Sequence, residues 1–326
     1  VVFTDNPTIT ITDASVASAT LNTVNAATTG LVTVNSGTIT GTEANINTAL
    51  TAGTRTFNND GTVNFEPTIA GLTDINVTVN ADDPVAIAAL QTITGRTTGV
   101  VTAAVTETNV ETLLTNANKA KLQTNANNKF SFSVTTSTTT ANSVAADDLI
   151  ALAGLTTGGN TVKVVVTGSV TGSEADLKTV YAANGTLTNA GAVPTGSTFG
   201  GLEVEPLTVS GSSLTAEGLL YLDGKTSGLV THSAANVSGT EADIRALYTA
   251  DTGNNATIAG TAVGTIITVT DSNVSAANLN TVNGLTEAVV TSTATTITGA
   301  YTDVRLALLA NNSQKLANDG SVTNAA

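Results

Sequence analysis

Adjacent carboxylates are the residues of this chain whose type and spacing most directly suggest chemistry. They occur as Asp82-Asp83 and Asp147-Asp148. Calcium takes carboxylate and carbonyl oxygens as ligands, so these four residues are candidate calcium ligands. Acids at such places more commonly cap helices and form turns, and we expect that role first.

Catalytic groups are sparse. His232, in Thr231-His232-Ser233, is the single histidine, and the chain contains no Cys, Met or Trp. Thiolate metal sites and disulfides are therefore excluded, and a strand or surface role is expected for His232. Because no Ser-His-Asp spacing, phosphate loop or paired catalytic carboxylates stand out, we expect no enzymatic activity and no cofactor.

Composition narrows the class of protein. The 326 residues carry a formal net charge of −14, with 11% charged, 3% aromatic and 41% apolar residues. This apolar share argues against simple disorder. Eleven Lys and Arg against twenty-five acids argue against nucleic-acid binding. No apolar run approaches the ~20 residues of a membrane-spanning helix.

Two short motifs alternate along the chain and organise it. The first type begins near an acid and ends with Thr-Thr-Gly or a relative, as in residues 13–30. The second type contains Gly-Ser/Thr-Glu-Ala-Asp/Asn and is clearest at residues 170–181 and 237–248. Further copies of the second type lie at residues 39–46 and, in degenerate form, 297–304. A regular period indicates repeated supersecondary units.

Each motif predicts a strand, a corner, a short helix and a return loop. Ser173 and Thr240 lie three residues before Asp176 and Asp243, the spacing of a capping box. Apolar residues then follow at helical spacing, and Thr-Thr-Gly is expected to end the helix in the first type. The pattern predicts two buried sets of residues. They are Leu21, Leu90, Leu149, Leu219 and Leu279, and then Ile46, Val110, Leu177, Ile244 and Val304.

Strands that alternate regularly with short helices favour parallel pairing and right-handed connections. We therefore predict a right-handed parallel β-solenoid with short α-helices along one wall. About ten half-repeats of about 32 residues would fill residues 1–326 as a single domain. An ordinary doubly wound sheet is the alternative. The long loops after the second motif type should stand on one face, which is often the contact face.

The two ends of the sequence would fit each other. Joining residue 326 of one copy to residue 1 of another places about 34 residues between Leu308 and the next Val16. The corresponding internal gaps run from about 26 to 35 residues. Head-to-tail self-association of subunits would explain this match, and a segment cut from a longer array would explain it equally well. The residues expected at this contact are Val1, Val2, Phe3, Ser321, Val322 and Thr323.

The motif Val-Thr-Gly-Ser-Glu-Ala-Asp-Leu at residues 170–177 and the Leu-Asn-Thr-Val-Asn type at residues 279–283 resemble a known group. These are the large Thr/Asn/Ala-rich repeat proteins of bacterial, especially cyanobacterial, cell surfaces. The resemblance implies an extracellular, cell-surface, non-enzymatic role. Our expectation is a structural protein that forms a filament or surface layer by coil completion between termini. The alternative is an adhesin or receptor-binding stalk that makes cell-surface or glycan contacts through the long loops.

Overall fold

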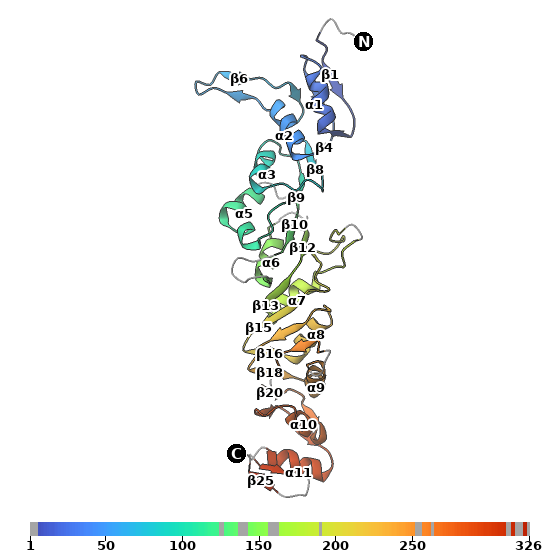
Figure 1. Cartoon of the computed structure of the whole chain (residues 1–326), viewed down its shortest axis with the longest axis vertical. Helices are drawn as coiled ribbons and strands as arrows, with labels where there is room; N and C mark the ends of the chain where they lie inside the picture. The colour runs from blue at the N-terminus through green and yellow to red at the C-terminus, as the bar shows by residue number, and fades with distance from the viewer. Residues whose placement is uncertain are drawn as a thin grey trace. The chain divides into compact units, whose positions relative to one another are not determined.

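The computed structural model describes residues 6–123, 127–135, 143–155, 163–188, 191–251, 256–261, 264–310, 314–316 and 322–324. Figure 1 shows the helices and strands of the chain. They divide into two compact units. Unit 1 comprises residues 1–144, 148–167 and 184–201, and unit 2 comprises residues 145–147, 168–183 and 202–326. The assignment of residues 1–326 to a single domain stays a prediction.

Unit 1 is built around a seven-stranded sheet whose strands pair in parallel, in the order β14-β12-β10-β9-β8-β4-β2. Its strands are β2 (Ser15–Ala17), β4 (Thr38–Gly41), β8 (Asn76–Val79), β9 (Val101–Val105), β10 (Lys129–Val134), β12 (Lys163–Val166) and β14 (Phe199–Gly200). A three-stranded parallel sheet has the order β1-β3-β7, with β1 (Ile9–Ile11), β3 (Val32–Val34) and β7 (Ile69–Ala70). The strands β5 (Thr56–Phe57) and β6 (Val63–Phe65) form an antiparallel hairpin inside one of the predicted long loops.

Short helices accompany these strands. Those of unit 1 are α1 (Ser18–Ala26), α2 (Glu43–Ala52), α3 (Ile87–Thr94), α4 (Val110–Leu113) and α5 (Asn116–Leu122). The strand β11 (Ser143–Ala145) and the helix α6 (Ala146–Ala153) contain residues of both units.

In unit 2, β13 (Ser169–Ser173), β15 (Leu207–Ser210), β17 (Val230–His232) and β19 (Ile258–Ala259) follow one another in parallel. A second parallel sheet has the order β16-β18-β20-β22, with β16 (Ser213–Thr215), β18 (Asn236–Gly239), β20 (Ile266–Val269) and β22 (Val290–Ser292). The pair β21 (Asn273–Ser275) and β23 (Thr296–Thr298) is also parallel. The strands β24 (Gln314–Leu316) and β25 (Val322–Asn324) form an antiparallel hairpin. The helices are α7 (Glu174–Ala182), α8 (Ala216–Asp223), α9 (Glu241–Ala250), α10 (Ala276–Asn283) and α11 (Tyr301–Ala310).

The prediction of a single β-solenoid, or parallel β-helix, is wrong. The chain is a mixed α/β fold of separate, mostly parallel sheets. The reason lies in how strands pair between motifs. From a first motif to the second motif after it, equivalent strands pair with each other, in several copies 23 residues apart, as in Thr208 beside Thr231. Most motifs have two strands, and we call the one directly before the helix the corner strand. From a second motif to the next first motif, the corner strand pairs with the earlier strand of that next motif, as β18 does with β20. At three such steps the pairing moves from one strand of the motif to the other, and the described strands divide into several separate sheets.

The predicted helix starts are confirmed. Ser173 Oγ accepts a hydrogen bond from the Asp176 N–H at 3.1 Å, and Thr240 Oγ1 accepts one from the Asp243 N–H, also at 3.1 Å. Each hydroxyl also donates to the carboxylate of the same Asp at 2.6 Å. The cap satisfies a backbone donor that has no partner within the helix, which lets these short helices begin at a defined residue.

The core consists of the apolar residues that the motif spacing selected. Their side chains lie between the helices and the strands of the same motif. Eight of the ten predicted positions are fully buried: Leu21, Leu90, Leu149, Leu219, Ile46, Val110, Leu177 and Ile244. The last member of each set, Leu279 and Val304, is only half-buried. The motif nearest the C-terminus therefore lacks cover that the earlier copies have.

Candidate functional site

A threonine turn connects first-type helices to their own strands. Thr226 Oγ1 donates to the Glu205 carbonyl at 2.8 Å and accepts from the Gly228 N–H at 2.9 Å. Gly228 has no side chain because a Cβ there would lie 2.4 Å from the Glu205 carbonyl oxygen. The same two bonds recur at Thr28, Thr97 and Thr286.

The predicted role of Thr-Thr-Gly as a helix stop is therefore wrong. The helix α1 ends at Ala26 and α3 ends at Thr94, before their threonines. The threonine instead closes a turn onto the preceding strand. The side-chain bonds act beside a backbone bond of the same turn, from the Ser227 N–H to the Glu203 carbonyl at 2.7 Å, and sequence spacing alone did not reveal them.

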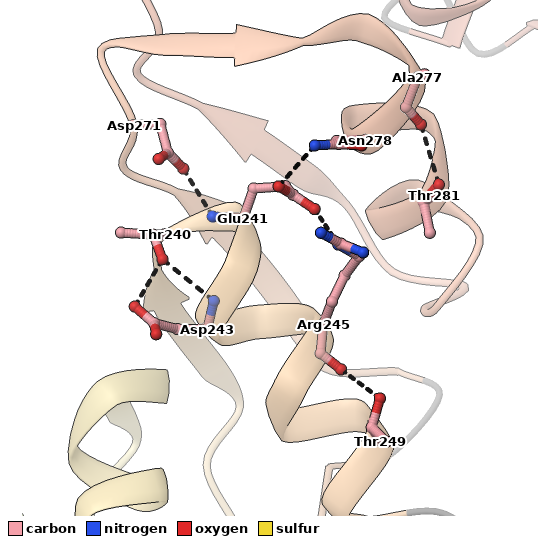
Figure 2. Close-up of polar contacts among 9 residues, drawn as sticks. All are labelled: Thr240, Glu241, Asp243, Arg245, Thr249, Asp271, Ala277, Asn278 and Thr281. Carbon is pink, nitrogen blue, oxygen red and sulfur yellow. Dashed lines mark hydrogen bonds and ion pairs between the residues drawn. The ribbon is translucent and has the colours of Figure 1, made fainter.

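Glu241 connects one motif to the next, and Figure 2 shows its surroundings. Its N–H, at the start of α9, donates to Asp271 Oδ2 at 2.7 Å. Its carboxylate accepts from Asn278 Nδ2 at 2.9 Å and from Arg245 Nε. Asp271 and Asn278 belong to the following first-type motif. The helix start of one motif is thereby tied by charge-assisted hydrogen bonds to the next motif.

Two other second-type motifs make related contacts. The Glu43 N–H donates to Asp83 Oδ2 at 2.7 Å. Glu174 accepts from Thr215 twice, from Oγ1 at 2.6 Å and from N–H at 2.9 Å, and it pairs with Lys178 at 3.1 Å. Partial burial alone would raise the pKa of Glu174, but the bonds from Thr215 and Lys178 outweigh it and hold that pKa below its usual value.

The four metal candidates do not come together. Asp83 caps α2, and Asp82 is an exposed turn residue. Asp147 is exposed in the first turn of α6, and Asp148 is half-buried beside it. In the part of the chain that the structure describes, no group of three or more His, Asp or Glu side chains could hold a metal ion. A calcium role for these residues stays a prediction.

His232 is a buried strand residue in β17. Its Nε2 lies 3.1 Å from Thr261 Oγ1, and its Nδ1 accepts weakly from the Ala234 N–H at 3.4 Å. Burial lowers the pKa of His232, against the opposite pull of the Asp251 carboxylate. Asp251 itself accepts from the Thr261 N–H at 2.8 Å rather than from the imidazole. This arrangement fixes the neutral ring in the core.

Two tyrosines at the ends of second-type helices have buried hydroxyls. Burial raises the pKa of Tyr181, and the carboxylates of Glu205 and Glu203 raise it further. Burial also raises the pKa of Tyr248, although a hydrogen bond with Thr286 opposes it. Both phenols are therefore held protonated, which suits a packing role and not a role as a base.

A groove of about 720 Å³ lies along the seven-stranded sheet of unit 1. Thr40, Thr78 and Thr102 line it from three neighbouring strands, in one row across the sheet. Lys129 and Lys163 also line it, and Lys163 Nζ donates to the Pro194 carbonyl at 2.9 Å and to the Ser197 carbonyl. The lysine thus holds the rim of the groove in place.

The residues expected at the self-association contact are only partly described. Val1, Val2, Phe3 and Ser321 lie outside the described residues. Val322 and Thr323 lie in β25 and pair with Leu316 and Lys315 of β24. Their role in assembly stays a prediction.

A surface that the sequence reasoning missed lies on the last second-type motif. Ile297 of β23 is 37% exposed and Leu308 of α11 is 56% exposed. The equivalent positions of earlier motifs are buried: Ile39, Val170 and Val237 for the strand, and Leu50, Tyr181 and Tyr248 for the helix. We call Ile297, Val304 and Leu308 the C-terminal face. The degenerate motif at residues 297–304 was visible in the sequence, but the loss of cover was not.

Comparison with known proteins gives no match to a family model, a curated protein or a solved structure. The resemblance to bacterial cell-surface proteins is thus untested, and the expectations of an extracellular location and of filament formation gain no support. None of the helices in the described residues has the length and apolar character needed to span a membrane.

Proposed function

We propose that this protein is a non-enzymatic structural protein whose copies associate end to end through the C-terminal face. The observation that carries the proposal is the exposure of Ile297 and Leu308 at positions that three earlier second-type motifs bury. Burying exposed apolar surface is the main driving force of protein association. The chemistry-bearing acids support the same conclusion, because Glu174, Glu241 and Asp83 are used in contacts between motifs.

The proposed occupant of this face is the N-terminal motif of a second copy. In the earlier motifs the equivalent face is covered by a first-type motif, as α2 is by α3 and α9 is by α10. The N-terminal motif of the chain is of this type. Its strand β1 has Ile9 and Ile11 half-buried, whereas the equivalent Ile267 and Val269 of β20 are fully buried. The C-terminal face and the strand β1 are therefore both less buried than their equivalents, which contact each other where a second-type motif is followed by a first-type motif in the same chain.

The test is the mass of the full chain in solution as a function of concentration, measured by sedimentation equilibrium. We expect the average mass to rise above the 32.4 kDa of one copy. Leu308→Gln should weaken association about fivefold, because roughly half of a leucine side chain is worth about 1 kcal/mol of burial. The matched control is Val204→Gln, since Val204 is 66% exposed away from this face.

A protein that stays at the mass of one copy at every concentration contradicts the proposal. Equal weakening by Leu308→Gln and Val204→Gln also contradicts it, because the loss would then not be specific to the C-terminal face.

Binding through the long loops is the second candidate, and one observation favours it. The β5–β6 hairpin exposes Phe57 at 59% and Phe65 at 38%. The same measurement separates the two candidates. If Phe57→Ser abolishes association while Leu308→Gln leaves it unchanged, the hairpin is the contact surface.

A further inference from the structure

Three internal junctions between a second-type motif and the next first-type motif use the same strand pairing. In each, one strand has the sequence apolar–Thr/Ser–Gly. It pairs in parallel with a strand of the sequence apolar–Thr–apolar. The central pairs are Thr40 with Thr78, Thr171 with Thr208, and Ser238 with Thr268. The register is thus the same in both units although the intervening loops differ in length.

Two described strands correspond to the two partners of this junction, but each is at the edge of its sheet. Among the described residues, β23 pairs only with β21, whereas its equivalents β4 and β18 pair on both sides. Likewise β1 pairs only with β3, whereas its equivalents β8 and β20 pair on both sides. The unpaired N–H and C=O groups of such an edge favour addition of another strand.

We propose that β23 of one copy pairs in parallel with β1 of the next copy, with Ile297 opposite Ile9, Thr298 opposite Thr10 and Gly299 opposite Ile11. This inference rests on the proposed end-to-end association and specifies its contact. The sequences fit the internal pattern, since Ile-Thr-Gly ends the one strand and Ile-Thr-Ile forms the other.

The backbone just after β23 resembles that of one internal junction. Gly299 has φ 154°, close to the φ 151° of Gly41. The Gly41 carbonyl accepts a hydrogen bond from the Asn80 N–H at 2.9 Å, just beyond β8. The equivalent donor for the Gly299 carbonyl would be the N–H of Thr12 in the second copy.

A second contact supports the same junction. Asp271 caps the start of α9 through the Glu241 N–H, and Asp83 caps the start of α2 through the Glu43 N–H. Tyr301 stands at the equivalent first position of α11 and is 79% exposed. Asp13 holds the place of Asp271 in the N-terminal motif and is exposed. Asp13 of the next copy therefore reaches the N-terminus of α11 in the proposed pairing, where a carboxylate is favourable.

A second copy fits better than an unrelated partner because both halves of the junction are present in one chain with matching exposure. The contact is heterologous, since β23 and β1 are different surfaces, so each copy offers one free end for the next.

The experiment uses the absence of cysteine from the chain. Full-length protein carrying Thr10→Cys and Thr298→Cys is oxidised at a concentration where it associates, and the products are separated by non-reducing electrophoresis. Directly opposed residues of neighbouring strands lie about 4.8 Å apart, within the Cα separation that a disulfide spans. We expect a ladder of covalent multimers, whereas either single variant gives nothing larger than a dimer.

The control moves one cysteine two residues along the strand, in Thr12→Cys with Thr298→Cys. The Cα separation there would be about 8 Å in the proposed register, too far for a disulfide. If this pair forms the ladder and the Thr10 pair does not, the register is wrong while end-to-end association stands. If neither pair links although sedimentation shows association, the β23–β1 contact is wrong. If the protein does not associate at all, the proposed function fails with it.

Asp13→Ala gives an independent measurement by sedimentation. Loss of the cap should weaken association about tenfold, within the range measured for helix N-cap residues. Unchanged association would contradict the role of Asp13.

Discussion

Replacing Thr226 with valine tests the threonine turn, which the structure shows four times. Valine keeps the shape of the side chain but removes the donor to the Glu205 carbonyl and the acceptor for the Gly228 N–H, at 2.8 and 2.9 Å. Each bond contributes about 1 kcal/mol net, and a buried group left without a partner costs about 1–3 kcal/mol. Because Thr226 is only 9% exposed, we expect a loss of about 2–4 kcal/mol in the free energy of unfolding.

The assay is urea unfolding followed by circular dichroism, together with native-state hydrogen exchange at the Gly228 amide. Exchange is needed because a chain with two compact units need not unfold in one step. The matched control is Thr208→Val, since Thr208 is exposed on β15 and shares its hydroxyl bond with Thr231 at 2.8 Å. The control should stay within about 0.5 kcal/mol of the parent.

A Thr226→Val variant as stable as the Thr208→Val control, with unchanged exchange at Gly228, would refute the reasoning. The turn would then be held by packing alone, and the recurrence of Thr at positions 28, 97, 226 and 286 would have another cause.

Three further predictions concern the core and the titrating groups. Leu177→Ala should cost about 2–5 kcal/mol in unfolding free energy because Leu177 is fully buried, whereas Leu229→Ala, at 41% exposure, should cost far less. The Glu174 pKa is depressed in the folded state, so Glu174 stabilises the fold above its unfolded pKa, and this contribution is lost as pH falls through the folded pKa. Glu174→Gln should reduce the decline of unfolding free energy at acid pH. The His232 pKa is also depressed in the folded state, so its stabilisation is complete above the ordinary histidine pKa of about 6.5 and declines below it. His232→Gln should remove that decline, and an unchanged slope between about pH 5 and about pH 6.5 would contradict the burial of a neutral ring.

Local structure was predictable from the sequence because it depends on neighbouring residues. The hydroxyl–carboxylate spacing at Ser173 and Asp176 located a helix start, and the helical spacing of Leu177 selected a buried face. Parallel pairing also followed from the alternation of strands and helices, as in β13 with β15. These features need only the periods of helix and strand and the chemistry of caps.

The arrangement of the sheets was not predictable in the same way. A regular motif period says that units pack on their neighbours, but not which of two strands in each motif makes the pair. The corner strand β18 pairs with β20 and not with β21, although both precede α10 in the same motif. That choice depends on long-range contacts such as the Asp271 cap on α9, which bring β20 alongside. The predicted solenoid failed at this step because the motif period does not say which strand of the next motif becomes the partner.

The degenerate final motif differs from the earlier copies at the start of its helix. Glu241 and Thr240, which connect and cap α9, are replaced by Tyr301 and Ala300 at the start of α11. In the earlier copies the Glu and its neighbours satisfy the helix start and tie it to the next motif within the chain. In α11, Tyr301 and Ala300 cannot supply the bonds that Glu241 and Thr240 make, while the apolar positions Val304 and Leu308 are kept. A neighbour would therefore be held there by strand pairing, apolar contact and the carboxylate of its own Asp13. That is why the β23–β1 pairing is the contact to test first, and why association should be sensitive to Leu308→Gln.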